Sequence, residues 1–317
     1  IEQQIIEPVK LTRDMERDGY IKPARIQETI AILKNYRKIV DGAKIENHIC
    51  YTDPTIANAR NQIAFLDEVY KTVSLYFKVL TPEEQISALH SAIMYSFAMT
   101  RGLIIQVGDY STQLIKFNRR VVTNSASLPF GTVNLLEKVK EKSSAERMDI
   151  VVELMTKEFK KLSWLYNMEE DSEIIGVGEV FNSLGKLSRK ATHYPLELAH
   201  NYEVTNTSFQ NVYNLIRGLD LDKAKKLKGI SEKRADVIAI GLAIVKAIYN
   251  EFVRDCIKVS TNGEMYGIVA KNLLGQTGEK PLLDILGYSL SSINEFYPTN
   301  INIDSNYSIA VILYKQL

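Results

Sequence analysis

This 317-residue chain has few cysteines, almost no net charge and no long apolar run. Its two cysteines, Cys50 and Cys256, each lie in an apolar stretch, which excludes a disulfide-stapled miniprotein and predicts buried, reduced thiols. Lys and Arg number 39 against 38 Asp and Glu, so the net charge is only +1. Bulk charge therefore gives no argument for nucleic acid or an anionic membrane as a partner, and any anion site must be local. No apolar run reaches the roughly 18–20 residues that a membrane helix needs.

The amino-acid composition is that of a globular protein. Hydrophobic residues make up 45% of the chain and charged residues 24%, which excludes a disordered or collagen-like chain. The length suggests about two domains. No signal peptide is visible, and the abrupt opening at Ile1-Glu2-Gln3 is interpreted as the start of a truncated or partly ordered chain.

The first hundred residues alternate between strand and helix patterns. The expected strands cover residues 5–11, 46–51 and 75–81, and the expected helices begin at Pro23, Ala57 and Pro82. Pro23 suits a first helical position, and Gly42 stands just past the end of that helix. Strands separated by helices of this length imply a parallel sheet.

A three-strand meander is expected next, followed by alternating helices and strands. The meander covers residues 102–108, 112–117 and 120–128, and later strands cover 173–177 and 257–260. Residues 102–108 are almost continuously apolar, which is typical of a strand buried on both faces. Helices are expected from Thr132, Ser143, Glu179 and after Gly229. Ser143 and Glu146 form a capping-box pattern at the start of the longest of these helices.

This order predicts an α/β protein with two actin-like, ribonuclease-H-like lobes around a cleft. Residues 1–98 are expected to form the first lobe, residues 99–280 the second, and residues 281–317 the start of a C-terminal helical region. The first lobe lacks the hairpin that supplies central strands of this fold. Because a missing central strand leaves the backbone groups of its neighbours unpaired, we expect that residues precede Ile1 or that this lobe is disordered or rebuilt.

Six short motifs occur in a recognisable order. They are residues 56–61, Thr81-Pro82-Glu83-Glu84-Gln85, Gly108-Asp109-Tyr110-Ser111-Thr112, residues 127–131, Ile175-Gly176-Val177-Gly178, and the segment from Gly229 through Arg234-Ala235-Asp236 to Gly241. Together they resemble the exopolyphosphatase and guanosine pentaphosphate phosphatase family over nearly the whole chain. Each motif alone is weak, and the resemblance depends on all six being in register.

The resemblance implies an activity and a set of partners. It implies hydrolysis of terminal phosphoanhydride bonds in inorganic polyphosphate or in pentaphosphate nucleotides, with magnesium, by a cytoplasmic homodimer that binds neither nucleic acid nor membrane. In such a site, glycine-rich turns approach phosphate with their backbone N–H groups. The matching positions are Gly108, Ser111, Thr112, Gly176 and Gly178, which are therefore the expected phosphate-binding residues.

Several residues depart from the family pattern. Gln85 stands where the family has its water-activating glutamate, and an amide cannot take a proton, a loss that typically costs about 10²–10⁴-fold in rate. Gln106 replaces an aspartate that helps to hold the metal, and a neutral amide is a poor partner for magnesium. Ala57 replaces the phosphate-contacting arginine. Asp109 and Tyr110 bring a negative charge and a bulky ring to the phosphate loop. These departures predict weakened or lost catalysis, and no metal ligand is assigned.

Two hypotheses follow. In the first, the alignment slips by one residue and Glu84 is the catalytic base, with Glu83 or Asp109 as relocated metal ligands. Carboxylates directly after Pro82 also suit a helix N-terminus without any catalytic role. In the second, the chain is a non-catalytic member that binds a phosphate-rich ligand or a protein. The basic run Lys223, Lys225, Lys226 and Lys228 either guides a polyanion or forms a solvated helix face.

Overall fold

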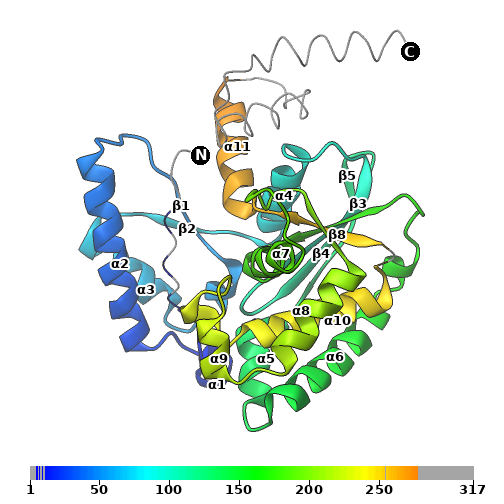
Figure 1. Ribbon diagram of the computed structural model, residues 1–317. Helices are drawn as coiled ribbons and strands as arrows, with labels where there is room; N and C mark the ends of the chain where they lie inside the picture. Colours follow the sequence, from blue (N-terminus) through cyan, green and yellow to red (C-terminus); the bar gives the residue numbers. More distant parts are fainter. Residues whose placement is uncertain (1–4, 6, 8, 10, 254, 278–317) are drawn as a thin grey trace.

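The computed structural model describes residues 5, 7, 9, 11–253 and 255–277, which form two sheets with helices around them (Figure 1). The smaller sheet pairs β1 (Cys50–Thr52) with β2 (Phe77–Val79) in parallel. The larger sheet has six strands in the order β5-β4-β3-β6-β8-β7. The mixed α/β architecture with actin-like lobes, expected from the order of the sequence patterns, is confirmed.

Helices enclose the core of the first lobe. They are α1 (Met15–Asp18), α2 (Pro23–Gly42), the short 3₁₀ helix η1 (Pro54–Asn58) and α3 (Gln62–Val73). Ile26 and Ile30 of α2 are buried in one cluster with Phe65 and Val69 of α3. The helix expected from Ala57 is divided into η1 and α3. The described residues 5, 7, 9 and 11 are not in a strand, and the rest of the strand expected at 5–11 lies outside the described residues.

The larger sheet contains the expected meander. It consists of β3 (Arg101–Val107), β4 (Thr112–Asn118) and β5 (Val121–Leu128). The strand β4 pairs antiparallel with both β3 and β5. On the other side of β3 lie β6 (Glu173–Val177), which runs parallel to β3, and β8 (Cys256–Ser260), which runs parallel to β6. The strand β7 (Tyr202–Thr205), which the sequence patterns did not predict, pairs antiparallel with the edge of β8.

Helices cover both faces of this sheet. One face packs against α5 (Thr132–Val139), α6 (Ser144–Lys160), α7 (Glu179–Ala191), α8 (Asn206–Arg217) and α10 (Ile238–Glu251). The other face packs against α4 (Pro82–Met94), over which lies α11 (Glu264–Thr277). Side chains of β3 alternate between the faces, with Leu103 and Ile105 in the first core and Ile104 in the second, as expected for a strand buried on both sides. Three short helices complete the description: η2 (Ser163–Tyr166), α9 (Leu221–Lys226) and η3 (Glu232–Arg234).

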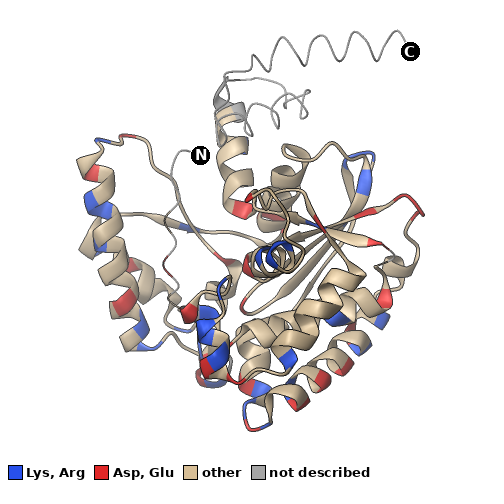
Figure 2. Ribbon diagram, in the orientation of Figure 1, with Lys and Arg blue, Asp and Glu red and all other residues tan. Residues whose placement is uncertain are grey.

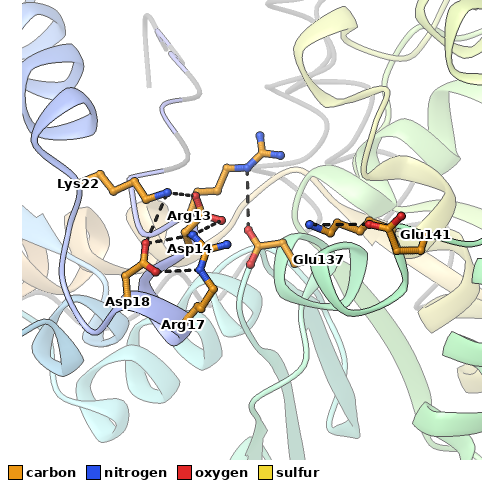
Figure 3. Close-up of polar contacts among 8 residues, drawn as sticks. Arg13, Asp14, Arg17, Asp18, Lys22, Glu137 and Glu141 are labelled. Carbon is orange, nitrogen blue, oxygen red and sulfur yellow. Dashed lines mark hydrogen bonds and ion pairs between the residues drawn. The ribbon is translucent and has the colours of Figure 1, made fainter.

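A surface ion pair joins the N-terminal segment to the second lobe. Nε of Arg13 lies 3.9 Å from Oε1 of Glu137 in α5, beside a cluster of charges around α1 (Figure 3). Both side chains are partly exposed, so the pair contributes at most about 1 kcal/mol. The division into lobes at residues 98 and 99 stays a prediction, and the expected C-terminal helical region lies outside the described residues.

The two cysteines are not joined by a disulfide. Cys50 and Cys256 are both free, and each is partly rather than fully buried. Burial raises the pKa of both thiols, so neither is activated as a nucleophile. Within the described residues, none of the helices has the length and apolarity needed to cross a bilayer.

Candidate functional site

A cavity of about 360 Å³ lies where the two lobes face each other. We call it the cleft cavity. One wall comes from residues after β1, including Asp53, and from the N-terminal segment. The opposite wall comes from Gln106 at the end of β3 and from the loop Gly108–Ser111, and Gln85 of α4 also lines the cavity.

The topology of the large sheet brings the two glycine turns together. Strands β3 and β6 are parallel neighbours, with Gln106 paired to Val177, so both end at the same edge of the sheet. Gly178 follows β6 with a φ of +99°, a conformation that L-residues other than glycine rarely adopt. A Cβ at Gly178 would lie 3.4 Å from the carbonyl oxygen of Val107. Gly178 therefore serves the close approach of the α7 N-terminus to the end of β3.

The five expected phosphate-binding residues fall into two groups. Gly108 and Ser111 line the cleft cavity, and the N–H of Gly108 donates to the carbonyl oxygen of Ser111 at 2.9 Å. Thr112 is fully buried, and its hydroxyl donates to the carbonyl oxygen of Phe130 at 2.7 Å. Gly176 is buried, and a Cβ there would lie 2.2 Å from the ring of Phe181.

This placement divides the set predicted from the sequence. The structure brings Gly108, Ser111 and Gly178 to one edge of the sheet, whereas Thr112 and Gly176 have packing roles beneath it. Whether any of the five binds phosphate stays a prediction.

Asp109 is held by an arginine from a distant motif. Nη2 of Arg234 donates to Oδ1 of Asp109 at 2.6 Å, and the hydroxyl of Thr132 donates to the same carboxylate at 3.2 Å. The backbone carbonyl of Asp109 accepts from Val133 at 2.8 Å, which fixes the loop to the first turn of α5. Asp109 therefore closes the phosphate loop with an internal ion pair, and its carboxylate is already engaged rather than open to a metal.

We expect Asp109→Asn to lower the free energy of unfolding by about 1.5–3 kcal/mol, the range for hydrogen bonds to charged groups. The side chains of Arg234 and Asp109 are only 19% and 27% exposed, so solvent screens this pair less than it screens a surface pair. Urea unfolding measures the change. The matched control is Asp149→Asn, which breaks the more exposed pair with Arg217 and should cost less than about 1 kcal/mol. Equal losses in the two variants would contradict a structural role for the Asp109 pair.

The buried amide of Gln85 connects two carboxylates. The side chain is 6% exposed, and its Nε2 donates to Oδ2 of Asp53 and to Oε2 of Glu264, both at 2.9 Å. Its Oε1 accepts from Nε2 of Gln113 on β4. Gln85 thus occupies the cleft wall, as the motif alignment predicted, while the carboxylate beside it comes from a different helix.

Close packing between α11 and α4 carries Glu264 to this position. A Cβ at Gly267 would lie 1.8 Å from the carbonyl oxygen of Ala88, so only glycine allows the two helices to touch there. Residues three apart share a helix face. Glu264 lies three residues before Gly267, and Gln85 lies three residues before Ala88, so the same contact that needs Gly267 brings Glu264 over Gln85.

The environment of Glu264 changes its acidity. Burial, helped by the nearby charge of Asp53 and opposed by the hydrogen bond from Gln85, raises the pKa of Glu264 to about 7. Asp53 is more exposed, and its other oxygen accepts from the backbone N–H of Thr55 at 2.7 Å at the start of η1. Glu264 is therefore partly protonated at neutral pH.

Two more glutamines lie near Gln85: Gln106 lines the cleft cavity, and Gln113 is buried behind it. Gln106 and Gln113 are opposite each other on the antiparallel strands β3 and β4, so their side chains share the sheet face that packs against α4. The Oε1 atom of each is buried, and within the described residues neither has a hydrogen-bond partner. Buried polar atoms are rarely left unpaired, so the oxygen of Gln106, a lining residue of the cleft cavity, suits a water or ligand in that cavity.

Glu84 points away from the cleft cavity. Its carboxylate accepts from the backbone N–H of Thr81 in a capping box and forms an ion pair with Lys78. The hydrogen bond from Lys78 lowers the pKa of Glu84. Glu83 and Glu84 line a separate surface hollow. The geometry therefore gives Glu84 the helix-capping role and does not support it as the base, nor Glu83 as a metal ligand in the cleft.

The motif at residues 56–61 is also structural. The side chain of Asn61 accepts from the N–H of Ile21 at 2.8 Å and donates to its carbonyl oxygen at 2.9 Å, which ties α3 to the segment before α2. Ala57, at the position of the family arginine, lies exposed in η1 and does not line the cleft cavity. Among the described lining residues there is no Lys or Arg, whereas Glu7, Asp53 and Asp109 are acidic. The cleft cavity is therefore a poor site for a free anion.

Comparison with known proteins agrees with the motifs and the topology. A family model described as the Ppx/GppA phosphatase family matches residues 3–276. The chain is 25% identical over 284 residues to a bifunctional 3-dehydroquinate synthase/phosphatase from Fusobacterium nucleatum subsp. nucleatum. This match covers 84% of the chain but only 41% of that longer relative.

Solved structures give the same result. The crystal structure of the Aquifex aeolicus member of the Ppx/GppA family superposes with a TM-score of 0.70 at 26% identity, over 86% of this chain and 90% of that one. An exopolyphosphatase from Cytophaga hutchinsonii shares the fold with a TM-score of 0.77 at 18% identity, over 85% and 88% of the two chains. The chain therefore belongs to the Ppx/GppA phosphatase family.

Proposed function

We propose that this chain hydrolyses phosphoanhydride bonds of inorganic polyphosphate or a pentaphosphate nucleotide, at a low rate, with Glu264 as the proton acceptor. The observation that carries the proposal is the partly buried Glu264 carboxylate at 2.9 Å from Nε2 of Gln85, the residue that stands where the family has its glutamate. The printed names of the Fusobacterium relative, a phosphatase, and of the Cytophaga structure, an exopolyphosphatase, support the reaction class.

The acid–base properties of Glu264 suit this role. A general base works best when its pKa lies near the working pH, because it is then largely deprotonated and still basic enough to take a proton. With a pKa of about 7, a large share of Glu264 is ionised at neutral pH, and this carboxylate accepts the proton of a water bound beside Gln85, which lines the cleft cavity. Gln85 orients this carboxylate through its N–H group and itself takes no proton.

Substrate charge needs compensation that the described side chains do not supply. Magnesium is commonly bound through one or two carboxylates, with water and substrate phosphate oxygens as its other ligands. Asp53 provides one carboxylate, and the unpaired Oε1 atom of Gln106 adds a hard oxygen donor in the same cavity, so the residues present fit this ion while Glu264 stays free to accept a proton. When bound, it would neutralise the charge that develops on the transferred phosphoryl group.

The rate is expected to be low for two reasons. Gln85 removes the carboxylate from the family position, and the described lining residues include no arginine. An arginine at a phosphoryl transition state is worth roughly 10³–10⁵ in rate.

A second candidate function is that of a non-catalytic member that binds a phosphate-rich ligand or a protein partner. The ion pair between Asp109 and Arg234 favours it, because this pair occupies the turn that would otherwise bind phosphate. The homodimer and the cytoplasmic location stay predictions.

Phosphate release from linear polyphosphate and from guanosine pentaphosphate tests the proposal. With excess magnesium, the purified protein is expected to release phosphate above a buffer control but at least about 10²-fold more slowly than the Cytophaga exopolyphosphatase assayed in parallel. Chelation by EDTA should abolish the release, because the cleft cavity then has no cation. Thermal stabilisation by either compound without release would support the non-catalytic candidate instead. Neither release nor stabilisation would remove both.

A further inference from the structure

A second cavity lies outside the cleft, among the helices of the second lobe. It has a volume of about 350 Å³, and we call it the α5 hollow. Its walls come from α5, the start of α6, the segment that leads from the end of α8 into α9, and the start of α10. It shares no lining residue with the cleft cavity.

The elements that form the α5 hollow also hold the phosphate loop. The carbonyl oxygen of Asp109 accepts from Val133 in the first turn of α5, and Leu136, three residues further along this helix, lines the hollow. Arg234 pairs with Asp109, and the next residue, Ala235, lines the hollow. A ligand in the hollow would therefore contact both elements that fix the loop without entering the cleft cavity.

Much of the wall is apolar and reaches the main core. Ile216 of α8 and Ile238 and Ile240 of α10 line the hollow, although each is at most 4% exposed. The volume lies within the range of about 300–1,000 Å³ that is typical of small-molecule sites. Because burial of apolar surface is favourable, this wall suits the apolar part of a ligand.

A buried polar atom in this wall lacks a partner. Nε of Arg147, near the start of α6, is buried and has no hydrogen-bond partner among the described residues. Nη2 of the same side chain donates to the carbonyl oxygen of Lys140 at the end of α5, which holds the guanidinium in place. Since buried donors are rarely left unpaired, Nε of Arg147 suits an acceptor group of a ligand.

The other charges around the α5 hollow are mixed in sign. Figure 2 shows basic and acidic residues alternating along α6 and lying together around α9. The other charged residues that line the hollow are Arg13, Lys140, Glu137, Asp220 and Asp236. Arg13 and Glu137 form the ion pair drawn in Figure 3. Three carboxylates repel a polyanion, so the hollow is a poor site for a chain of phosphates.

We propose that the α5 hollow binds a small organic molecule with an apolar body and a single carboxylate. The carboxylate accepts from Nε of Arg147, because a guanidinium matches the geometry of a carboxylate. The apolar body packs against Ile216, Ile238 and Ile240. A wholly apolar molecule would leave the arginine donor unpaired. The site lies outside the cleft, so the proposal does not depend on hydrolysis there.

Calorimetric titration with octanoate, below the concentration at which it forms micelles, tests this site. Octanol has the same apolar chain without the charge, and the natural protein is expected to bind it at least about tenfold more weakly than octanoate, equivalent to roughly 1.4 kcal/mol. Arg147→Gln should weaken octanoate binding by a similar factor, about tenfold or more, and leave octanol binding nearly unchanged.

Arg217→Gln is the matched control for the arginine variant. Arg217 lies at the end of α8, donates to Asp149 of α6 at 2.6 Å and does not line the hollow. Its loss removes the same charge nearby and should change octanoate affinity by less than about twofold, because solvent and salt screen exposed charges.

Ala239→Leu tests the cavity without changing its charge. Ala239 lines the hollow and is partly exposed, so a larger side chain there takes up space in the hollow and should weaken both octanoate and octanol binding. Thermal unfolding without ligand checks that all three variants fold. Loss of octanoate binding in both hollow variants, with the control unchanged, supports the proposal.

Several results would overturn it. They are absence of octanoate binding by the natural protein, equal affinity for octanoate and octanol, undiminished octanoate affinity in Arg147→Gln or Ala239→Leu, and an equal loss in Arg217→Gln. Tighter binding of tripolyphosphate than of octanoate, abolished by Arg147→Gln, would also overturn it, because that result would assign the hollow to a polyanion.

Discussion

Gln85→Glu is expected to lower the free energy of unfolding of the magnesium-free protein by about 3–5 kcal/mol, the cost of an uncompensated buried charge. In the natural protein, the N–H groups of Gln85 satisfy Asp53 and Glu264 together, each at 2.9 Å. A third carboxylate at this buried position would remove both donors. It would also bring three like charges together within hydrogen-bond range, which raises their pKa values and disfavours folding at neutral pH.

The same substitution should make stability dependent on magnesium. A carboxylate at position 85 beside that of Asp53 forms a stronger site for a divalent cation than Asp53 alone, and a ligand that binds only the folded state stabilises it in proportion to its occupancy. We therefore expect excess magnesium to raise the melting temperature of Gln85→Glu by several degrees more than that of the natural protein. Differential scanning calorimetry in EDTA and in magnesium measures both effects.

Gln62→Glu is the matched control for the Gln85 variant. Gln62 is the first residue of α3 and partly exposed, and a carboxylate is favourable at a helix N-terminus, so its stability should change by less than about 0.5 kcal/mol. A Gln85→Glu protein as stable in EDTA as the natural one would show that the amide does not hold Asp53 and Glu264 together. A loss that magnesium does not recover would contradict the cation site but leave the hydrogen-bond role intact.

The parts of the fold that the sequence predicted are those decided by local spacing. The strand at Glu173–Val177 is bounded as expected, and Ser143 caps α6 through Glu146 as the capping-box pattern indicated. The strand Tyr202–Thr205 has only four residues and lies at an edge of the sheet, and a run that short carries too little periodicity to be recognised.

The candidate site was harder to predict because its contacts join distant segments. Gln85 and Glu264 are 179 residues apart, and Asp109 and Arg234 are 125 apart. The sequence placed Asp109 correctly in the loop but gave no sign that an arginine neutralises it. For Glu264, the available signal was Gly267 three residues later, which marks a close helix contact only once the facing helix is known.

Glu264→Gln is expected to reduce magnesium-dependent phosphate release by about 10²–10⁴-fold, the usual loss when a general base is removed. The activity of the natural protein should rise with pH through about 7, since the carboxylate of Glu264 must be ionised to accept a proton. Phosphate release measured between pH 5.5 and 8.5 tests both expectations. Glu84→Gln is the control, and because Glu84 caps a helix outside the cleft, its rate should stay within about twofold of the natural rate.

The pH dependence of stability reports the ionisation of Glu264 independently of activity. The folded protein binds the proton of the Glu264 carboxyl group more tightly than the unfolded chain does, where the pKa of this group is 4.5. The free energy of unfolding therefore falls as the pH rises from about 4.5 through 7. Above pH 7 the full cost is roughly 3 kcal/mol, and Glu264→Gln, which cannot ionise, should avoid it. The variant is therefore expected to be more stable than the natural protein at pH 8 and nearly equal to it at pH 4.

Urea unfolding at the two pH values separates structure from catalysis. Equal stability differences at pH 4 and pH 8 would show that Glu264 does not titrate near 7, and the argument for it as a proton acceptor would fail. A pH-dependent gain in stability together with unchanged phosphate release would keep the buried carboxylate but assign the base to another residue. If Glu84→Gln lost activity while Glu264→Gln kept it, the base would lie on the helix-capping side that the structure turns away from the cleft.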